Sequence, residues 1–387
     1  MEAFLLVFAA ISAVILCFHS ILALGCLLNL ARERRLARVG ASSGAGGPTG
    51  ALIAEVIVAV RNEEKLLPRL LSALGAQTRR DCLFLLVDDR STDATPQLLE
   101  RFCRDLGSRA RLLRAEREPE GLTGKQAALD LAFSQARGDV LLFTDGDCSP
   151  PPTWVEEMMR HFADPRTGVV LGRIELESRK GFLLRFQGFE QPLLNQYNFG
   201  SLGVGLPTGG FGNNMAVRAV AVRQTGGFQA LGFSVTEDAM LLDAVCRGAG
   251  WKGAVCTASG AAMLTDPKPT WREYVNQHTR WNAGAIYSAD FVTRASYWFV
   301  VVFYLTGSLL VLPLGFLDWR VPLLSLTSFV SIGLLGVIAG FYEGRARIGY
   351  FLRFVPYLVF FAFFYTFVTL RAAIRRPFEW KGARLAG

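Results

Sequence analysis

The sequence predicts an α/β domain with a mostly parallel, doubly wound sheet, flanked by apolar segments long enough to cross a membrane. Strand-like runs rich in branched apolar residues alternate with segments of helical periodicity between residues 54 and 174. Hydrophobic residues make up 51% of the 387 residues, and the mean hydropathy of +0.30 is high for a soluble protein. The apolar excess lies in four blocks, at 3–30, 297–316, 321–341 and 354–370.

The formal net charge of +8 lies largely beside these apolar blocks. Basic residues occupy 32–38 after the first block, and a second basic group follows the last block. This placement fits the positive-inside rule and contact with anionic lipid, and it does not favour nucleic acid as a partner. The seven cysteines include no C-x-x-C pair, which argues against a disulfide framework or a zinc site and for reduced thiols facing the cytoplasm.

The stretch at 3–30 has no basic start and is longer than a signal-peptide core, so it predicts an uncleaved membrane helix. The C-terminal topology stays open: an odd number of crossings would put the basic tail outside, so one block is predicted to be re-entrant or interfacial. The predicted segments are an N-terminal membrane helix at 1–31, a basic and glycine-rich linker at 32–50, a cytoplasmic domain with interfacial amphipathic helices at 51–290, membrane segments at 291–372 and a basic cytoplasmic tail at 373–387.

Within the predicted domain, hydrophobic periodicity assigns the elements one by one. Ser91 or Thr92 is predicted to cap the second helix, and Ser234 with Glu237 has the spacing of a capping box before the last of these helices. The predicted strands are 54–60, 83–87, 112–113, 140–143 and 168–174, and the predicted helices are 66–74, one ending near 103, 126–136, 154–162 and 239–247.

Acidic residues follow two of these strands directly. Asp88 and Asp89 end the second strand, and Asp145 and Asp147 follow the central strand at 140–143. Ligands of open α/β sheets bind beyond the carboxyl ends of the strands. Two acids one residue apart at such a place can hold a divalent cation that in turn holds a diphosphate. The alternative is a polar turn, because Asp and Gly are common turn residues.

Two glycine-containing loops add candidate ligand contacts. Lys125 opens the helix at 126–136, where a lysine can meet a phosphate. It does not belong to an ATPase phosphate loop, because Pro119 replaces the first glycine of that motif and Gln126 follows the lysine. The glycine-rich loop at 208–214 allows its backbone to approach a ligand.

Two further helices are predicted to be amphipathic, at 180–200 and 271–281. Either core packing or a position at the bilayer interface accounts for their apolar faces. On the second helix, Gln277, Arg280 and Trp281 share one face, and His278 is predicted to point elsewhere without a role. Asp238 lies in a first helical turn, where its anionic form is favoured, although Thr-Glu-Asp is also ordinary helix-start chemistry.

The chain resembles the membrane-bound family 2 glycosyltransferases in its ordered series of motifs. These are Asp88-Asp89, Asp145-x-Asp147, Glu237-Asp238 and Gln277-x-x-Arg280-Trp281. The resemblance extends from Val56 to Trp281 and is nearest to ceramide and carotenoid glucosyltransferases. It implies a nucleotide-diphosphosugar transferase (GT-A type) domain with a Rossmann-like sheet. The chain has Gly-Asn-Asn at 212–214 where processive synthases have an F-C-G-S-like stretch, which weakens the processive alternative.

The resemblance also implies roles for individual residues. Asp238 would be the catalytic base, with Glu237 as the next candidate, and Asp145 and Asp147 would bind Mg²⁺ or Mn²⁺. Asn213, Asn214 and Trp281 would lie on the sugar or acceptor side. The nucleotide-sugar contacts would be Asn62, Glu63, Asp88, Asp89, Lys125, Asp145, Gln277, Arg280 and Trp281.

The predicted function is transfer of a sugar from a nucleotide-diphosphate sugar, such as a UDP-hexose, to the hydroxyl of a membrane lipid. An ionised Asp would take the proton of the attacking hydroxyl, and a single displacement would invert the anomeric centre. The predicted location is the bacterial inner membrane, with the catalytic domain in the cytoplasm. Two alternatives remain: a processive synthase of the cellulose, poly-N-acetylglucosamine or chitin-oligosaccharide type, and a non-catalytic nucleotide-sugar-binding membrane scaffold.

Overall fold

The computed structural model describes residues 2–43, 52–177, 180–287, 318–342 and 348–374, with shorter pieces within 291–316 and 378–385. The chain forms two compact units. One, here called the helical unit, combines Met1–Cys26, Ser178–Gly200 and Pro267–Gly387. The other, here called the sheet unit, combines Leu27–Glu177 and Ser201–Asp266. The predicted 51–290 domain is therefore divided, because both of its amphipathic helices cluster with the apolar helices.

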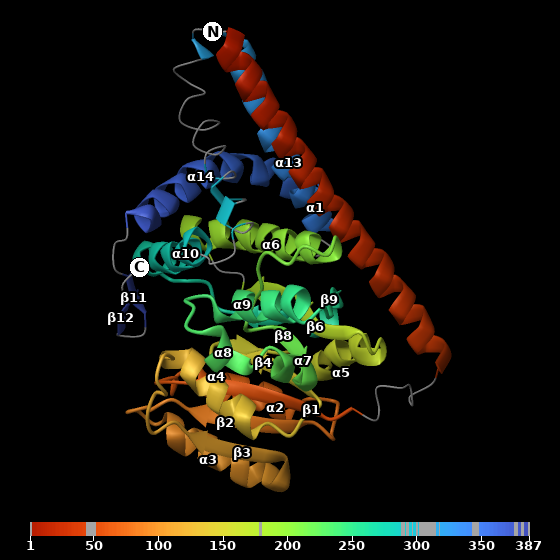
Figure 1. Ribbon diagram of the computed structural model, residues 1–387, viewed down its shortest axis with the longest axis vertical. Coiled ribbons are helices and arrows are strands. Elements are labelled where there is room, and N and C mark those ends of the chain that lie inside the picture. The colour runs from red at the N-terminus through yellow and green to blue at the C-terminus, as the bar shows by residue number, and fades with distance from the viewer. Residues whose placement is uncertain are drawn as a thin grey trace. The chain divides into compact units, whose positions relative to one another are not determined.

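The sheet unit is built on a seven-stranded sheet with the order β3-β2-β1-β4-β8-β6-β9 (Figure 1). β1 pairs in parallel with β2 and β4, β2 with β3, and β6 with β9. Only β8 runs antiparallel to its neighbours, so the predicted mostly parallel α/β sheet is confirmed. The strands are β1 Ala54–Val60, β2 Leu83–Asp88, β3 Ala110–Arg114, β4 Val140–Thr144, β6 Thr167–Gly172, β8 Met215–Arg218 and β9 Lys252–Cys256.

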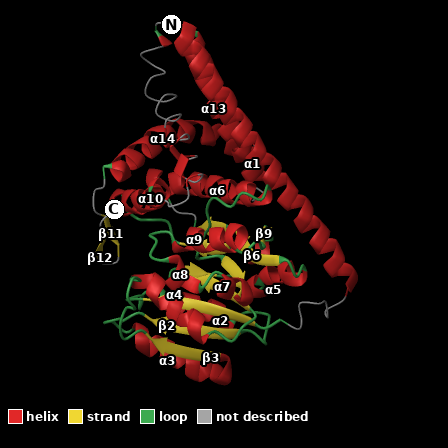
Figure 2. Ribbon diagram, viewed as in Figure 1, coloured by secondary structure: helices red, strands yellow, loops and turns green. Residues whose placement is uncertain are grey.

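Helices lie among these strands (Figure 2), and three further strands form a second, small sheet. The small sheet has the order β5-β10-β7, with β5 Cys148–Ser149, β7 Ile174–Leu176 and β10 Met263–Thr265. The helices of the sheet unit are α2 Leu67–Gly75, α3 Thr95–Leu106, η3 Gly107–Arg109, α4 Gly124–Gln135, α5 Trp154–Met159, η4 Arg160–Ala163, α7 Ala219–Gln224, α8 Gly227–Leu231, α9 Glu237–Asp243, η5 Ala244–Gly248 and η6 Ser259–Ala261.

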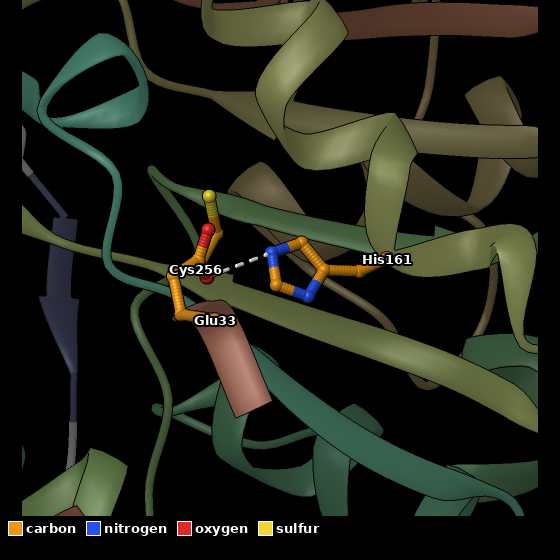
Figure 3. Close-up of side chains that lie close together, drawn as sticks. All are labelled: Glu33, His161 and Cys256. Atoms are coloured by element: carbon orange, nitrogen blue, oxygen red, sulfur yellow. Dashed lines mark ion pairs between the residues drawn. The ribbon is translucent and has the colours of Figure 1, made fainter. Parts of the chain in front are cut away.

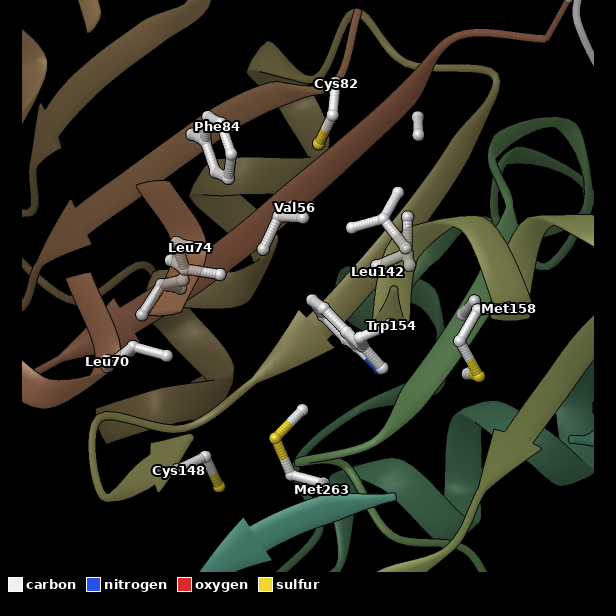
Figure 4. Close-up of a cluster of buried hydrophobic side chains, with 14 of the residues drawn as sticks. Val56, Leu70, Leu74, Cys82, Phe84, Leu142, Cys148, Trp154, Met158 and Met263 are labelled. Atoms are coloured by element: carbon white, nitrogen blue, oxygen red, sulfur yellow. The ribbon is translucent and has the colours of Figure 1, made fainter. Parts of the chain in front are cut away.

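The core of the sheet unit follows from the two-residue period of its strands. Alternate residues of β1, β2 and β4, such as Val56, Phe84 and Leu142, share one buried cluster with α2, α3 and α5 (Figure 4). Trp154 of α5 lies fully buried in this cluster. On the opposite face, Phe133 of α4 contacts Phe143 of β4 and stacks on Phe228 of α8. Because both faces are covered, the carboxyl ends of the strands are the edge left for a ligand.

Two predicted helix caps are wrong. α3 begins at Thr95 rather than after Ser91 or Thr92, because the carboxylate of Asp93 accepts the Thr95 backbone N–H at 3.0 Å. Thr236, not Ser234, precedes α9, and no side chain caps that helix. The hydroxyl of Ser234 instead accepts the backbone N–H of Thr236, which shapes the loop before the helix. Asp238 nevertheless lies in the first turn of α9, as predicted.

The helical unit contains the first part of α1 Glu2–Ser43 and the later apolar helices. α1 continues through the predicted linker at 32–50 as far as Ser43, so the basic residues 32–38 are helical. Among the described residues, three helices are long and apolar enough to cross a membrane: Glu2–Leu36, Arg320–Tyr342 and Pro356–Ala373. The predicted block at 297–316 lies largely outside the described residues.

The two predicted amphipathic helices pack within the helical unit as α6 Phe182–Gly203 and α10 Trp271–Ile286. α14 Ile348–Ala373 contacts both, and aromatic rings from the three helices meet there, for example Phe186, Tyr274 and Phe364. Core packing therefore accounts for much of the apolar face of α6, and a position at the bilayer interface stays a prediction. The other elements of this unit are α13 Arg320–Tyr342 and the hairpin β11 Phe378–Trp380 with β12 Ala383–Leu385.

Candidate active site

Lys125 joins three acidic residues at the carboxyl end of the central strand. The lysine lies in the first turn of α4, and its Nζ is 2.5 Å from Oδ1 of Asp145, which follows β4 directly. Oε1 of Glu237 is 3.5 Å from the same Nζ. Burial lowers the pKa of Lys125, but the nearby charges of Asp145, Glu237 and Asp238 raise it more, so the pKa lies above its ordinary value. The lysine is therefore a permanent cation between β4 and α9.

Asp238 combines a partly buried carboxylate with two backbone donors. Its Oδ2 accepts the N–H of Gly212 at 2.7 Å, and its Oδ1 accepts the N–H of Ala239 at 2.8 Å. Burial and the charge of Glu237 raise the pKa of Asp238 to about 6, although the Gly212 N–H and Lys125 oppose the rise. A carboxylate with such a pKa is ionised at neutral pH and basic enough to accept a proton from a hydroxyl.

The approach between Gly212 and Asp238 leaves little room for a side chain at position 212. A Cβ atom at position 212 would lie 3.1 Å from Cβ of Asp238 and 3.3 Å from its Oδ2. The glycine-rich loop at 208–214 was predicted to bring its backbone to a ligand. In the structure, this loop brings its backbone to Asp238, so its role is to hold the candidate base.

A small pocket lies between α4, β4, β8 and α9. Its polar walls are Lys125, Thr144, Gly212, Glu237 and Asp238. Its remaining walls are apolar: Leu129, Phe133, Phe143, Met215, Phe228 and Leu241. Apolar walls exclude water, which strengthens the electrostatic interactions of the three charged side chains.

Asp147 lies two residues beyond Asp145 on the turn between β4 and β5. Among the described residues, no group of three protein ligands gathers around these two acids. Mg²⁺ in phosphate-handling sites commonly uses one or two carboxylates and completes its coordination with substrate phosphates and water. The pair therefore fits a divalent cation held jointly with a diphosphate, and Lys125 is the cation that contacts Asp145 in this structure.

The residues predicted to bind the nucleoside lie at the ends of β1 and β2 and are linked to one another. Asn62 has a left-handed backbone, with φ of 53°, and its Oδ1 accepts the N–H of Thr92 at 2.8 Å. Glu63 donates its N–H to Oγ1 of Thr95 at 2.8 Å. Asp88 accepts the N–H of Ser91 at 3.2 Å. These contacts fasten the loop after β1 to the loop after β2.

Two arginines that the sequence analysis missed hold this region together. Arg90 contacts Asp89 at 2.8 Å and Glu118 at 2.6 Å, and Glu118 in turn accepts the N–H of Gly124 at the start of α4. The backbone of Arg90 is left-handed, with a φ of 58°. Asp89 is therefore paired with Arg90 in this structure.

Arg69 of α2 is the second missed arginine. It donates to the backbone oxygen of Asp147 at 2.6 Å and pairs with Asp266 at 3.1 Å. It thereby fixes the turn that carries both predicted metal ligands. Periodicity could not reveal either arginine, because Glu118, Asp147 and Asp266 lie far from them in the sequence.

The two predicted asparagines of the glycine-rich loop have different environments. Asn213 is partly exposed, and its Nδ2 lies 3.6 Å from Sγ of Cys148. Asn214 is fully buried and accepts the Trp154 indole N–H at 2.8 Å. Its Nδ2 donates to the backbone oxygens of Arg173 and Ala261. The amide of Asn214 is thus hydrogen-bonded within the core, and its predicted place on the sugar or acceptor side stays a prediction.

Gln277, Arg280 and Trp281 lie half-buried on α10 in the helical unit. His278 lies on another face of α10, as predicted, but it is not without a role. It is buried, its Nε2 is 2.8 Å from Oε1 of Glu190 on α6, and its ring contacts Trp281 edge-on. Tyr365 of α14 donates to the same Glu190 oxygen at 2.8 Å. His278 therefore ties the helix of the predicted Gln-x-x-Arg-Trp motif to α6 and α14.

Comparison with protein families agrees with this geometry. The sequence profile of glycosyl transferase family 2 matches residues 55–223. The profile of glycosyl transferase family group 2 matches residues 140–375, which is more than half of the chain. The chain belongs to the family 2 glycosyltransferases. Its motifs from Asp88 to Trp281 fall inside the matched region.

Two curated relatives are similar over part of their length. One is the undecaprenyl-phosphate 4-deoxy-4-formamido-L-arabinose transferase of Pseudomonas fluorescens, 34% identical over 34% of this chain and 38% of the relative. Another is the beta-monoglucosyldiacylglycerol synthase of Synechocystis, 29% identical over 36% of this chain and 29% of the relative. The chain thus spans less than half the length of these relatives in the matched region.

A solved structure shares the fold of this glycosyltransferase. It is the mannosyltransferase of Pyrobaculum calidifontis in complex with GDP-Man and Mn²⁺, with a TM-score of 0.52 and 16% sequence identity. The alignment covers 95% of this chain and 98% of that protein. The fold is of the GT-A glycosyltransferase type, as the sequence predicted.

Proposed function

We propose that this glycosyltransferase moves a single sugar from a nucleotide-diphosphate sugar to the hydroxyl of a membrane lipid, with inversion. The observation that carries the proposal is the environment of Asp238. Its carboxylate has a pKa of about 6, is held by the backbone of Gly212 and lies in the pocket with Lys125. This arrangement supports a general base beside a lysine in a water-poor site.

The donor side of the proposal rests on the carboxyl ends of β1, β2 and β4. Asp145 and Asp147 would hold Mg²⁺ or Mn²⁺, which when bound would neutralise charge on the leaving diphosphate. Lys125 adds a fixed positive charge beside Asp145. Asn62, Glu63 and Asp89 would face the nucleoside. The mannosyltransferase of the same fold was solved with GDP-Man and Mn²⁺, a donor and an ion of the kinds proposed here.

The reaction uses the protein groups as follows. The acceptor hydroxyl gives its proton to Asp238 as its oxygen forms a bond to the anomeric carbon. The bond from that carbon to the diphosphate breaks at the same time, and the electron pair leaves with the diphosphate oxygen. Attack from the face opposite the leaving group inverts the anomeric centre, so an α-linked donor gives a β-glycoside. Lys125 stabilises the charge that develops on the leaving group.

A lipid acceptor is supported by the membrane character of the chain and by its relatives. Three described helices are long and apolar enough to cross a membrane. The name of the first relative above contains undecaprenyl-phosphate, and the name of the second contains glucosyldiacylglycerol. We infer that Gln277, Arg280 and Trp281 on α10 serve the diphosphate and the acceptor, and that the membrane is the bacterial inner membrane with the sheet unit in the cytoplasm.

The test is a product assay with the purified chain in lipid vesicles. Radiolabelled nucleotide sugars are supplied one at a time, and the products are separated into an organic phase and a high-molecular-mass fraction. The proposal expects label in the organic phase with at least one donor. Label in polymer with none in the organic phase would support a processive synthase instead. Donor binding without transfer to any product, across a panel of lipids, would support the non-catalytic scaffold.

A further inference from the structure

A cluster of three metal-ligating side chains lies in the sheet unit and shares no residue with the candidate active site. Glu33 comes from the last part of α1, His161 from η4 and Cys256 from the end of β9 (Figure 3). One ligand atom from each residue lies within 4.8 Å of the other two, and all three residues are buried. Because the three residues are far apart in the sequence, no short sequence motif indicates the cluster.

The imidazole of His161 is the unusual member of the cluster. It is 5% exposed, and its Nε2 lies 3.2 Å from Oε2 of Glu33. This contact is an ion pair that lacks the angle of a regular hydrogen bond. A buried imidazole nitrogen beside a carboxylate and a thiol has the neighbours that a bound cation would use as its other ligands.

We propose that Glu33, His161 and Cys256 bind one Zn²⁺ ion, with water as the fourth ligand. Carboxylate oxygen, imidazole nitrogen and thiolate sulfur are the three ligand types that zinc uses in proteins. Zinc-ligand distances of about 2.0–2.3 Å place neighbouring tetrahedral ligands about 3.3–3.8 Å apart. Small side-chain movements would bring the three atoms from their present separations to that range.

The surrounding residues fit a bound zinc ion. Nη2 of Arg160 lies 3.3 Å from Oε1 of Glu33, and the backbone N–H of Thr257 donates to Oε2 at 3.3 Å. Such outer contacts orient the carboxylate. Zn²⁺ bound to one carboxylate and one thiolate has no net charge. The positive charge of Arg160 is then balanced by its ion pair with Glu157.

The thiol makes the site dependent on pH. Burial, with the charge of Glu33, raises the pKa of Cys256 well above its usual range, so without metal the thiol is protonated. Zinc binding forms the Zn–S bond and releases the thiol proton to water. The affinity is therefore expected to fall as the pH falls.

The proposed ion would join three elements of the sheet unit. About 20 helical residues cross a bilayer, whereas α1 has 42 residues, so the part that carries Glu33 lies beyond the hydrocarbon. Zinc would fasten this end of α1 to η4 and β9.

The test uses the purified full-length chain, zinc analysis by mass spectrometry and replacement of zinc by Co²⁺. We expect about one zinc ion per chain and, with Co²⁺, the near-ultraviolet absorption of a cobalt–thiolate bond. Cys148 lies beside Asp147, so loss of the band in Cys256→Ser is needed to place the cobalt–thiolate bond at Cys256. Cys256→Ser should abolish the band and His161→Gln should weaken zinc binding, whereas Cys82→Ser, at another buried cysteine, should keep both.

Two results would overturn the zinc site. The wild-type chain could contain no zinc and show no thiolate band at any Co²⁺ concentration, which would leave the cluster as an ion pair only. Alternatively, Cys256→Ser could keep the full zinc content and the band, which would place the ion elsewhere. The wild-type measurement decides the matter even if the Cys256 variant does not fold.

Discussion

Asp145 and Asp238 lie near the same lysine, yet they have different immediate partners. Asp145 is in direct contact with Lys125 at 2.5 Å. Asp238 instead receives backbone N–H groups from Gly212 and Ala239 and lies beside the negative charge of Glu237. Neighbouring carboxylates with different surroundings commonly take different roles. On the proposal above, these surroundings suit Asp145 to holding a cation and Asp238 to accepting a proton.

Asp238→Asn is expected to remove sugar transfer while donor binding stays within a few-fold of wild type. Asparagine keeps the shape of the side chain but cannot accept the proton, so kcat should fall on the order of a hundredfold or more. The measurement is single-turnover transfer together with donor titration. Asp243→Asn, at the other end of α9, is the matched control and should transfer normally. Normal turnover by Asp238→Asn would mean that Glu237 or another group is the base.

Glu237→Gln is expected to shift the pH profile of transfer. Asp238 acts only when ionised, so kcat/KM should fall as the pH drops through its pKa of about 6. The negative charge of Glu237 contributes to raising that pKa. Its removal should lower the pKa toward the ordinary value, which moves the acid limb of the profile to lower pH. An acid limb that stays where it is in the wild type would contradict the assignment.

Asp147→Ala and chelation by EDTA are both expected to abolish transfer. The reason is that Asp145 and Asp147 would form the cation site with the diphosphate, and Asp145 alone would keep only one of the two carboxylate ligands while it is paired with Lys125. Activity should return when Mg²⁺ or Mn²⁺ is added to chelated wild-type enzyme and should not return in the Asp147 variant. Full activity of the purified enzyme in EDTA would remove the metal from the mechanism.

At the scale of elements, the sequence was most informative where periodicity and burial act together. β1 was predicted at 54–60 and lies at Ala54–Val60, because both faces of this strand are buried. Boundaries set by side-chain contacts were predicted less well. α3 begins later than predicted, at Thr95, whose N–H is accepted by Asp93 in the preceding loop, and α10 continues to the buried Ile286.

The same limit applies to the candidate site. The acids at the ends of β2 and β4 and in α9 could be predicted, since their positions follow from the order of the elements. The role of Asn214 could not, because its partners Trp154, Arg173 and Ala261 come from three other segments. His278 was misjudged for the same reason: its partner Glu190 lies on another helix.

Gly200→Ala is expected to destabilise the packing of α1 against α6 within the helical unit. A Cβ at position 200 would lie 2.5 Å from the backbone oxygen of Leu22, and a Cβ at Gly25 would overlap the backbone oxygen of Gly200. Overpacking of this kind costs about 1–3 kcal/mol. Gly188→Ala, also on α6, meets no atom within 4 Å and is the matched control. Equal thermal unfolding of the two variants in detergent would contradict this close contact.

At the scale of the whole molecule, the chain divides according to the surfaces that its elements bury. α6 and α10 looked like parts of the catalytic domain in the sequence but cluster with the apolar helices. The reason is their aromatic faces, which contact α14 through rings such as Phe186 and Tyr274. The apolar blocks predicted the membrane segments and the positive residues beside them predicted the orientation, yet charge alone could not decide how often the C-terminal blocks cross.

The apolar character of the candidate membrane spans bears on the proposal that one sugar is added per lipid. A growing polysaccharide needs a polar, protein-walled path through the bilayer. The three described candidate spans are strongly apolar, and residues of this kind do not line a sugar channel. A lipid acceptor needs no such path, since its hydroxyl can reach a catalytic base from the membrane surface.

The most direct test of this account is the structure of the product made by the purified enzyme in lipid vesicles. The lipid extract is analysed by mass spectrometry for the number of sugars added and by NMR for the anomeric configuration. The account predicts one added sugar per lipid, in the configuration opposite to that of the donor, and no product from the Asp238→Asn enzyme. A long sugar chain, or a retained configuration, would contradict it.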